Sequence, residues 1–306
     1  MNVQTPYLAA INRAIDWIGA NLAGDTSLQT VARVAGFSSF HFHRVFTEAT
    51  GETLHAFVMR LRFERAISLL RTAPGKSLTS IALDAGFGSS SSLARAFAQR
   101  FSIKPSALRS RSAMQIFLTG SYANASRAAV EVKLAAASEP LSDPLKASLR
   151  IEQWPALPFA YVRIFAAYLK PEALVAGYRA IEDWADAESI GRARSRLIGM
   201  SIDDPAVVPA DKCRYDFCRE SSIRPKARSG VNYNTLAACT WAILPCRGGL
   251  AAVDRCWTYL FRDWLPRSGW QPAALPALEV FHQRPEEIGW DNFDLDCCLP
   301  LEARHR

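Results

Sequence analysis

The chain has 306 residues and a formal net charge of +7, with 49% hydrophobic and 21% charged residues. At about 100–200 residues per domain this length predicts two domains, or at most three, and the composition is that of a globular protein. No run of about 18 apolar residues is present, so no membrane-spanning helix is expected. The first four residues lack the basic start of a signal peptide.

The excess positive charge lies in the first third of the chain. Residues 1–111 hold 13 Lys and Arg against 6 Asp and Glu, whereas residues 112–306 hold 23 of each sign. A basic domain fused to a neutral one is typical of a protein that binds a polyanion with one part and performs a different task with the other. A basic solvated surface without a partner is the alternative that charge alone leaves open.

All seven cysteines follow residue 212, and they show neither CxxC nor Cys/His ligand spacing. Cys297 and Cys298 are adjacent, and adjacent cysteines rarely bridge each other. The sequence therefore predicts free thiols in a reducing cytoplasm, with no disulfide framework and no structural zinc site. No cofactor is expected either.

A pattern of ten residues occurs twice in the basic segment, at an offset of 50 residues. Leu28–Phe37 and Leu78–Phe87 both read L-x-x-[VI]-A-x-x-A-G-F. The apolar positions fall on one face of a short helix, a serine precedes each run as a helix cap, and Gly36 and Gly86 fall where the chain must turn. A second helix with a polar outer face follows each copy. The repeat therefore predicts two helix-turn-helix units.

A continuous helical stretch, roughly Thr53 to Thr72, joins the two units. Twenty residues at about 1.5 Å each span about 30 Å, and one turn of B-DNA is about 34 Å long. A helix of that length would hold the second helices of the two units near successive major grooves on one face of the DNA.

Residues 7–111 resemble the DNA-binding domain of the AraC/XylS family. The resemblance rests on the repeat and on Phe97–Arg109, which is similar to the family ending F-x-x-x-F-G-x-x-P-x-x-[YL]-R, with Ser102 in place of the usual glycine. It implies that the outer face of each second helix contacts DNA. The implied contact residues are Phe40, His43 and Arg44 in the first unit, and Ser90, Ser91, Ser92 and Arg95 in the second.

These residue types suggest different roles in the two units. The planar guanidinium of Arg44 suits a bidentate contact to O6 and N7 of guanine, Phe40 suits a thymine methyl, and His43 can donate to a base edge or a phosphate. The three serines are short, so we expect the second helix to grip phosphate and the first to read sequence. A weakly specifying, solvated helix start is the alternative for the serines, and a surface histidine without a partner is the alternative for His43.

Residues 112–148 are rich in Ala and Ser and contain Pro140 and Pro144, which predicts a linker. From residue 149 the pattern changes to two successive β-α-β-β units. The chain is thus expected to be an all-α double helix-turn-helix domain over residues 1–111, followed by an α+β domain with an antiparallel sheet and helices on one side. The expected strands and helices of the second domain are Leu149–Trp154, Phe159–Phe165, Pro171–Glu188, Arg196–Ile202, Cys213–Cys218, Leu236–Leu244, Leu250–Leu265, Ala277–His282 and Phe293–Leu299.

The second domain, residues 149–306, resembles the GyrI-like or effector-binding domain. The similarity rests on Ile198–Pro205, Trp264–Trp270 and Leu278–Phe281, whereas the family's G-P-Y is replaced by Ala166-Ala167-Tyr168. This order of domains is also similar to that of the right-origin-binding group of regulators.

The resemblance implies that Glu279 faces a central cleft between the two β-α-β-β units. A carboxylate among aromatic side chains suits flat, apolar cations. The candidate aromatic partners are Tyr168, Phe217, Trp241, Trp257 and Phe281. A surface carboxylate is the alternative for Glu279, and ordinary core packing is the alternative for each ring.

These observations favour a one-component transcription regulator and not an enzyme. A small-molecule effector in the neutral domain would shift the binding of the basic domain to double-stranded operator DNA, or its recruitment of RNA polymerase, provided that the effector favours one conformation. The first alternative is a small-molecule hydrolase in which Glu279 acts as general base. The second is a module that binds another protein.

Overall fold

The computed structural model divides into two compact units, a helical unit and a unit built on a β-sheet. The described residues are 5–73, 75–110, 113–114, 141–204, 207–226 and 229–303. Most of the predicted linker, residues 112–148, lies outside them, so its interpretation stays a prediction. None of the described helices has the length and hydropathy that crossing a bilayer requires.

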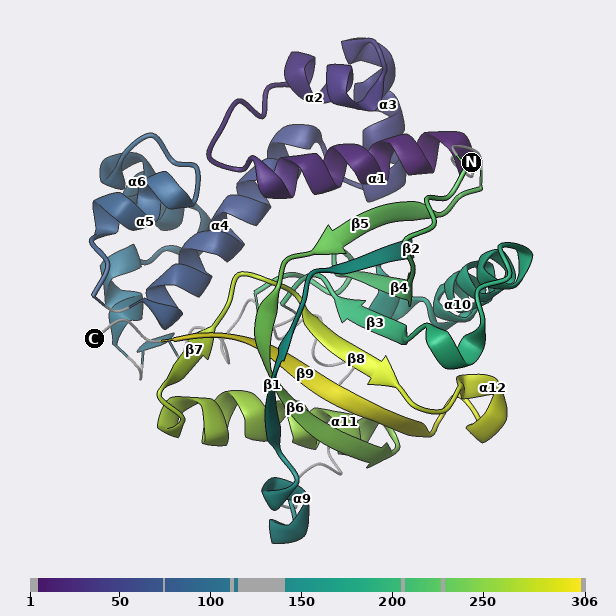
Figure 1. The fold of residues 1–306 in the computed structure, drawn as a ribbon. Helices are drawn as coiled ribbons and strands as arrows, with labels where there is room; N and C mark the ends of the chain where they lie inside the picture. The colour runs from purple at the N-terminus through teal and green to yellow at the C-terminus, as the bar shows by residue number, and fades with distance from the viewer. Residues whose placement is uncertain are drawn as a thin grey trace. The chain divides into compact units, whose positions relative to one another are not determined.

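The helical unit contains two groups of short helices and one long helix, α4, that runs between them (Figure 1). The elements in chain order are α1 (Thr5–Ala20), α2 (Leu28–Ala35), α3 (Ser39–Thr50), α4 (Leu54–Thr72), α5 (Leu78–Asp84), α6 (Ser90–Phe101) and the 3₁₀ helix η1 (Pro105–Arg109). Helices α1, α2 and α3 pack together, and α5, α6 and η1 form the second group. The predicted connecting helix is confirmed, and at about 1.5 Å per residue its 19 residues span about 28 Å.

Each repeat folds as helix, turn and helix because its caps are in the predicted places. The hydroxyls of Ser27 and Ser77 accept hydrogen bonds from the backbone N–H three residues ahead, at 3.4 and 3.0 Å. Gly36 and Gly86 have φ of 77° and 85°, a conformation that glycine adopts without steric cost. The buried stripe of α3 is Phe42, Val45 and Phe46, as expected.

Two positions that hold glycine in the family patterns carry other residues here. Ser102 ends α6 with φ 58°, and Ala166 precedes Tyr168 with φ 54°. A non-glycine residue in this left-handed region costs about 1–2 kcal/mol. The backbone at both places thus keeps a conformation that glycine would favour, although the side chain has changed.

The sheet unit contains nine described strands, all antiparallel to their neighbours. The strands are β1 (Arg150–Trp154), β2 (Leu157–Phe165), β3 (Leu197–Ser201), β4 (Arg214–Glu220), β5 (Asn232–Leu236), β6 (Cys239–Gly248), β7 (Trp270–Pro272), β8 (Ala277–Phe281) and β9 (Phe293–Ala303). Their order is β1-β6-β9-β8-β3-β4-β2-β5, and β7 pairs with β9. Two helices, α10 (Pro171–Ala187) and α11 (Leu250–Thr258), pack on the sheet.

The sheet order shows two related halves that meet between β3 and β8. One half reads β3-β4-β2 outward from this junction and the other reads β8-β9-β6, so each is one β-α-β-β unit with the same strand order. Helix α10 packs on β2 and β4, and α11 packs on β6 and β9 (Figure 1). The predicted α+β architecture is confirmed. In the order of the sheet, β3 and β8 lie between the strands that α10 covers and those that α11 covers.

Candidate functional site

The predicted DNA-reading residues of the first unit share the outer face of α3. The ring of Phe40 is 82% exposed, and His43 and Arg44 are exposed one helical turn further on. In an α-helix, positions three and four residues apart are neighbours on one face, so His43 and Arg44 lie beside Phe40. The structure thus brings the three side chains together, and their contacts with DNA stay a prediction.

The second unit presents its predicted residues at the start of α6. Ser91 and Arg95 are exposed, and Ser90 and Ser92 are half-buried. The hydroxyl of Ser92 donates to the carbonyl of Ser89 at 2.7 Å and accepts from its N–H at 3.0 Å. Ser92 therefore caps the N-terminus of α6 together with Ser89. Ser90, Ser91 and Arg95 remain as the candidates for contact with DNA.

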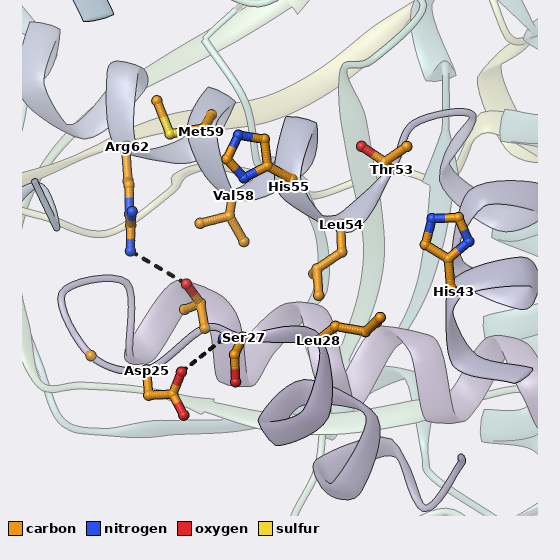
Figure 2. Close-up of a pocket in the computed structure, with 12 residues that line it drawn as sticks. Asp25, Ser27, Leu28, His43, Thr53, Leu54, His55, Val58, Met59 and Arg62 are labelled. Carbon is orange, nitrogen blue, oxygen red and sulfur yellow. Dashed lines mark hydrogen bonds between the residues drawn. The ribbon is translucent and has the colours of Figure 1, made fainter. Parts of the chain in front are cut away.

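A hollow of about 430 Å³ borders the outer face of α3 (Figure 2). Its walls are the loop from Gly24 to Leu28, the first turns of α4 and the side chain of His43. Arg62 donates to the hydroxyl of Thr26 at 3.3 Å, which ties the loop to α4. His43 thus stands at the rim of a hollow that also carries His55 and Arg62.

Glu279, the predicted ligand-binding carboxylate, lies in a row of register partners that crosses five strands of the sheet. Phe217 and Glu279 are both register partners of Gly199, Cys297 is the partner of Glu279, and Leu244 is the partner of Cys297. Residues in register on neighbouring strands point to the same face of a sheet. Phe217 packs in the apolar cluster under α10, and Cys297 and Leu244 pack in the cluster under α11, so both helices cover this face and Glu279 lies between them.

Two aromatic side chains donate hydrogen bonds to Glu279. The phenol of Tyr215, on β4, donates to Oε2 at 2.6 Å, and the indole of Trp257, on α11, donates to Oε1 at 3.3 Å. Burial raises the pKa of Glu279, and these two donors lower it by a smaller amount. Burial and the charge of Glu279 also raise the pKa of Tyr215. Tyr215 therefore keeps its proton and remains a donor.

Gly199 makes the Tyr215 contact possible. A Cβ atom built at Gly199 would lie 1.7 Å from the phenol oxygen of Tyr215 and 3.2 Å from the ring of Phe281. The phenol therefore occupies the space that a side chain on β3 would fill, and it crosses that strand to reach Glu279. The position calls for glycine because of this close approach.

Four of the five predicted aromatic partners lie on the face that Glu279 occupies. Trp257 donates a hydrogen bond to its carboxylate, Phe217 meets the ring of Tyr215 edge to face at 5.1 Å, and Phe281 packs against Phe217 at 6.3 Å between ring centroids. The phenol of Tyr168 lies 3.3 Å from the hydroxyl of Ser201, and its pKa is raised, chiefly by burial and in part by Glu279.

Trp241 does not join this group. Its ring is 1% exposed, it stacks on Trp154 at 5.3 Å, and it belongs to the apolar cluster of the opposite face, together with Leu278 and Val280. Glu279 lies between these two residues on β8, so alternation along the strand places it on the other face from Trp241.

A second hollow, of about 380 Å³, lies at the far end of β8 beside Phe281. Its lining includes Arg196, Arg219 and Arg284. Glu182 pairs with Arg219 at 3.5 Å and with Arg284 at 2.9 Å. These pairs balance part of the positive charge.

Sequence reasoning missed Gly199 and Tyr215 as parts of the site. Gly199 lies in Ile198–Pro205, a stretch that is similar to the family, but nothing in the order of residues indicates that the phenol of Tyr215 crosses β3 at this glycine. All seven cysteines are free thiols in the structure, and six of them are buried.

The comparisons with known proteins match both units. The family model described as GyrI-like small molecule binding domain matches residues 148–302, and a helix-turn-helix domain model matches residues 31–111. Transcriptional regulator Rob of Salmonella typhimurium is 32% identical over 101 residues, 33% of this chain and 35% of that protein. Right origin-binding protein of Escherichia coli K12 is 31% identical over 93 residues, 30% of this chain and 32% of that protein.

The chain thus spans about a third of the length of these curated relatives. Among solved structures, the C-terminal domain of EcmrR matches 51% of this chain and 98% of its own length, with 12% identity and a TM-score of 0.40. The GyrI-like match covers 155 of 306 residues. The chain belongs to the GyrI-like small molecule binding domain family, and it carries an AraC-type helix-turn-helix domain ahead of that domain.

Proposed function

We propose that this protein is a DNA-binding transcription regulator whose GyrI-like domain senses a flat, lipophilic cation at Glu279. The observation that supports sensing most strongly is the position of Glu279. Its carboxylate lies on the helix-covered face between α10 and α11, it accepts two hydrogen bonds from aromatic residues, and no described Lys or Arg pairs with it. A partly buried carboxylate without a cationic partner is stabilised when a cationic ligand supplies the missing charge.

DNA binding is supported by the basic helical unit and by the exposed face of α3. One face of α3 is buried in the core of the helical unit, and the exposed face carries Phe40, His43 and Arg44. Two helix-turn-helix units in one chain allow one molecule to bind two successive major grooves. The names of the relatives, which are regulators, agree with this part of the proposal.

Arg44→Ala should weaken binding to the operator by about 1–3 kcal/mol and relax the base preference at the contacted position. The operator is first located by footprinting the full chain on the DNA upstream of its own coding region. Affinities for that site and for random DNA are then measured over a range of salt concentrations, because phosphate contacts make both fall as salt rises.

Arg33→Ala is the matched control, since Arg33 is an exposed arginine on α2, outside the proposed reading face. It should weaken binding to operator and to random DNA by similar small amounts. If Arg44→Ala also weakens both to the same extent, Arg44 does not read bases. If the full chain protects no DNA even at low salt, the regulator proposal fails.

Glu279→Gln should weaken the binding of N-methylacridinium much more than that of acridine, which has nearly the same flat shape without the permanent charge. The amide keeps the volume of the carboxylate but loses its charge. Cation binding to the unmodified chain should also weaken as the pH falls, because burial raises the pKa of Glu279 and the carboxyl therefore takes up its proton at a higher pH than a free one.

Glu302→Gln, which changes an exposed carboxylate on β9, controls for the general loss of negative charge. Calorimetric titration of both ligands into both variants separates the outcomes. Equal loss of the two ligands in Glu279→Gln would remove the charge-pairing role. Chemical turnover of a bound ligand that disappears in Glu279→Gln would instead favour the hydrolase alternative.

A further inference from the structure

Three buried cysteines from three different elements meet on the face of the sheet that α11 covers. Cys246 lies on β6, Cys297 on β9 and Cys256 in the last turn of α11. Their sulfur atoms all lie within 4.8 Å of one another. We name Cys246, Cys256 and Cys297 the thiol cluster.

The register of the sheet explains why two of these sulfurs are close. Cys246 pairs with Leu295, and Cys297 pairs with Leu244, so the two cysteines occupy diagonal positions on neighbouring strands. Diagonal side chains on one face are near neighbours. Helix α11 packs on the same two strands and adds Cys256 from above. In sequence, 10 residues separate Cys246 from Cys256 and 41 separate Cys256 from Cys297, a spacing that matches no metal-binding motif.

The separation of the sulfurs suits a single metal ion. Thiolates bind zinc at about 2.3 Å, and three sulfurs at that distance in a plane around one ion lie about 4.0 Å from one another. Sulfurs within 4.8 Å reach this arrangement by shifts of a few tenths of an ångström. Small rotations of the Cys side chains supply such shifts without moving the strands.

The surroundings of the thiol cluster favour a soft ion over a hard one. All three cysteines are at most 1% exposed, and Leu244, Leu260 and Leu295 pack in the same cluster. Sulfur ligands select soft ions such as Cu(I), whereas hard ions prefer oxygen and water. No fourth His, Cys, Asp or Glu of the described residues joins the group, whereas structural zinc takes four ligands.

The helix that supplies Cys256 changes form directly beyond it. Helix α11 ends at Thr258 and continues as a π-helical segment, Tyr259–Trp264. π-helical segments are rare in proteins, and those that occur often lie at functional sites.

We infer that the thiol cluster is a three-coordinate site for a soft, thiophilic metal ion of the Cu(I) class. Each cysteine binds through its sulfur and gives its proton to solvent. The site is separate from the DNA-reading face, and it goes beyond the sensing of a cation at Glu279, because it uses different side chains and different chemistry.

The test is an anaerobic titration of the untagged, reduced full chain with Cu(I), in competition with a chromogenic Cu(I) chelator. We expect one tightly held equivalent and an ultraviolet sulfur-to-copper charge-transfer band. Removal of an outer-shell partner typically costs about 10–100-fold in metal affinity. Cys256→Ala removes a ligand itself and should cost at least as much.

Cys298→Ala is the matched control. Cys298 follows Cys297 in the chain and is equally buried, but it lies in the apolar cluster of the opposite face. It should keep both the affinity and the charge-transfer band. Circular dichroism of each variant establishes that it is folded, and Cys246→Ala gives a second test of the cluster should Cys256→Ala unfold.

Two results would overturn the inference. One is the absence of a tight equivalent in the reduced full chain. The other is a tight equivalent that survives in the folded Cys256→Ala and Cys246→Ala variants but is lost in Cys298→Ala, since the ion would then bind on the other face.

Discussion

Asp203→Ala should lower the free energy of unfolding of the sheet unit by about 3–5 kcal/mol. The carboxylate of Asp203 accepts hydrogen bonds from the backbone N–H of Arg214 at 2.7 Å and from its Nε at 2.8 Å. Both side chains are almost completely buried. Removing the carboxylate leaves the guanidinium charge in a low-dielectric interior without its counter-charge, and that desolvation cost dominates the effect.

Urea unfolding followed by tryptophan fluorescence measures this loss. Seven of the eight tryptophans follow residue 150, so the signal reports mainly on the sheet unit. Asp143→Ala is the control, because Asp143 pairs with Lys146 while 93% exposed, and it should leave the midpoint unchanged. The double variant Asp203→Leu/Arg214→Met should recover part of the loss, since it removes both buried charges. A loss below about 1 kcal/mol in Asp203→Ala would contradict the buried-pair argument.

Gly199→Ala should lower the free energy of unfolding by about 3 kcal/mol, which combines overpacking with the loss of a hydrogen bond to a charged group. The added Cβ would fall 1.7 Å from the phenol oxygen of Tyr215. The phenol must therefore move away from Glu279, which then loses its 2.6 Å donor. The same unfolding assay measures the loss.

A double-variant cycle separates this cause from a general effect of adding a methyl group. Tyr215→Phe removes the oxygen at 1.7 Å and leaves only the ring carbon Cζ at 2.6 Å, so Gly199→Ala/Tyr215→Phe should cost less than the sum of the two single variants. Gly191→Ala places its Cβ in open space and should change stability by less than about 0.5 kcal/mol. Additive single and double variants would show that the phenol does not depend on the gap at Gly199.

The helical unit was largely predictable from the sequence because its signals are local. Serines at 27 and 77 cap helices, Gly36 and Gly86 end them, and the apolar stripe of α3 has helical spacing. Each of these acts over a few residues, so a repeat offset by 50 residues was enough to predict the helix-turn-helix pair.

The sheet unit was predictable as a series of elements but not as a pairing. The hydrophobic pattern did not predict β5 or β7. It also predicted that β6 begins at Leu236, whereas Leu236 belongs to β5 and β6 begins at Cys239. It also could not show that β1 pairs with β6 of the other half, because strand pairing is decided by contacts between residues far apart in the chain.

The sequence by itself determined the two domains, the two helix-turn-helix units, the exposed face of α3 and Glu279 as a candidate. Only the tertiary structure decided which side chains share a face. It placed Trp241 on the opposite face from Glu279, brought Tyr215 to Glu279 across Gly199, and gathered Cys246, Cys256 and Cys297, for which the sequence showed no ligand spacing. Local patterns fix helices and turns, whereas a site assembled from several strands depends on register, and register follows from the packing of the whole sheet.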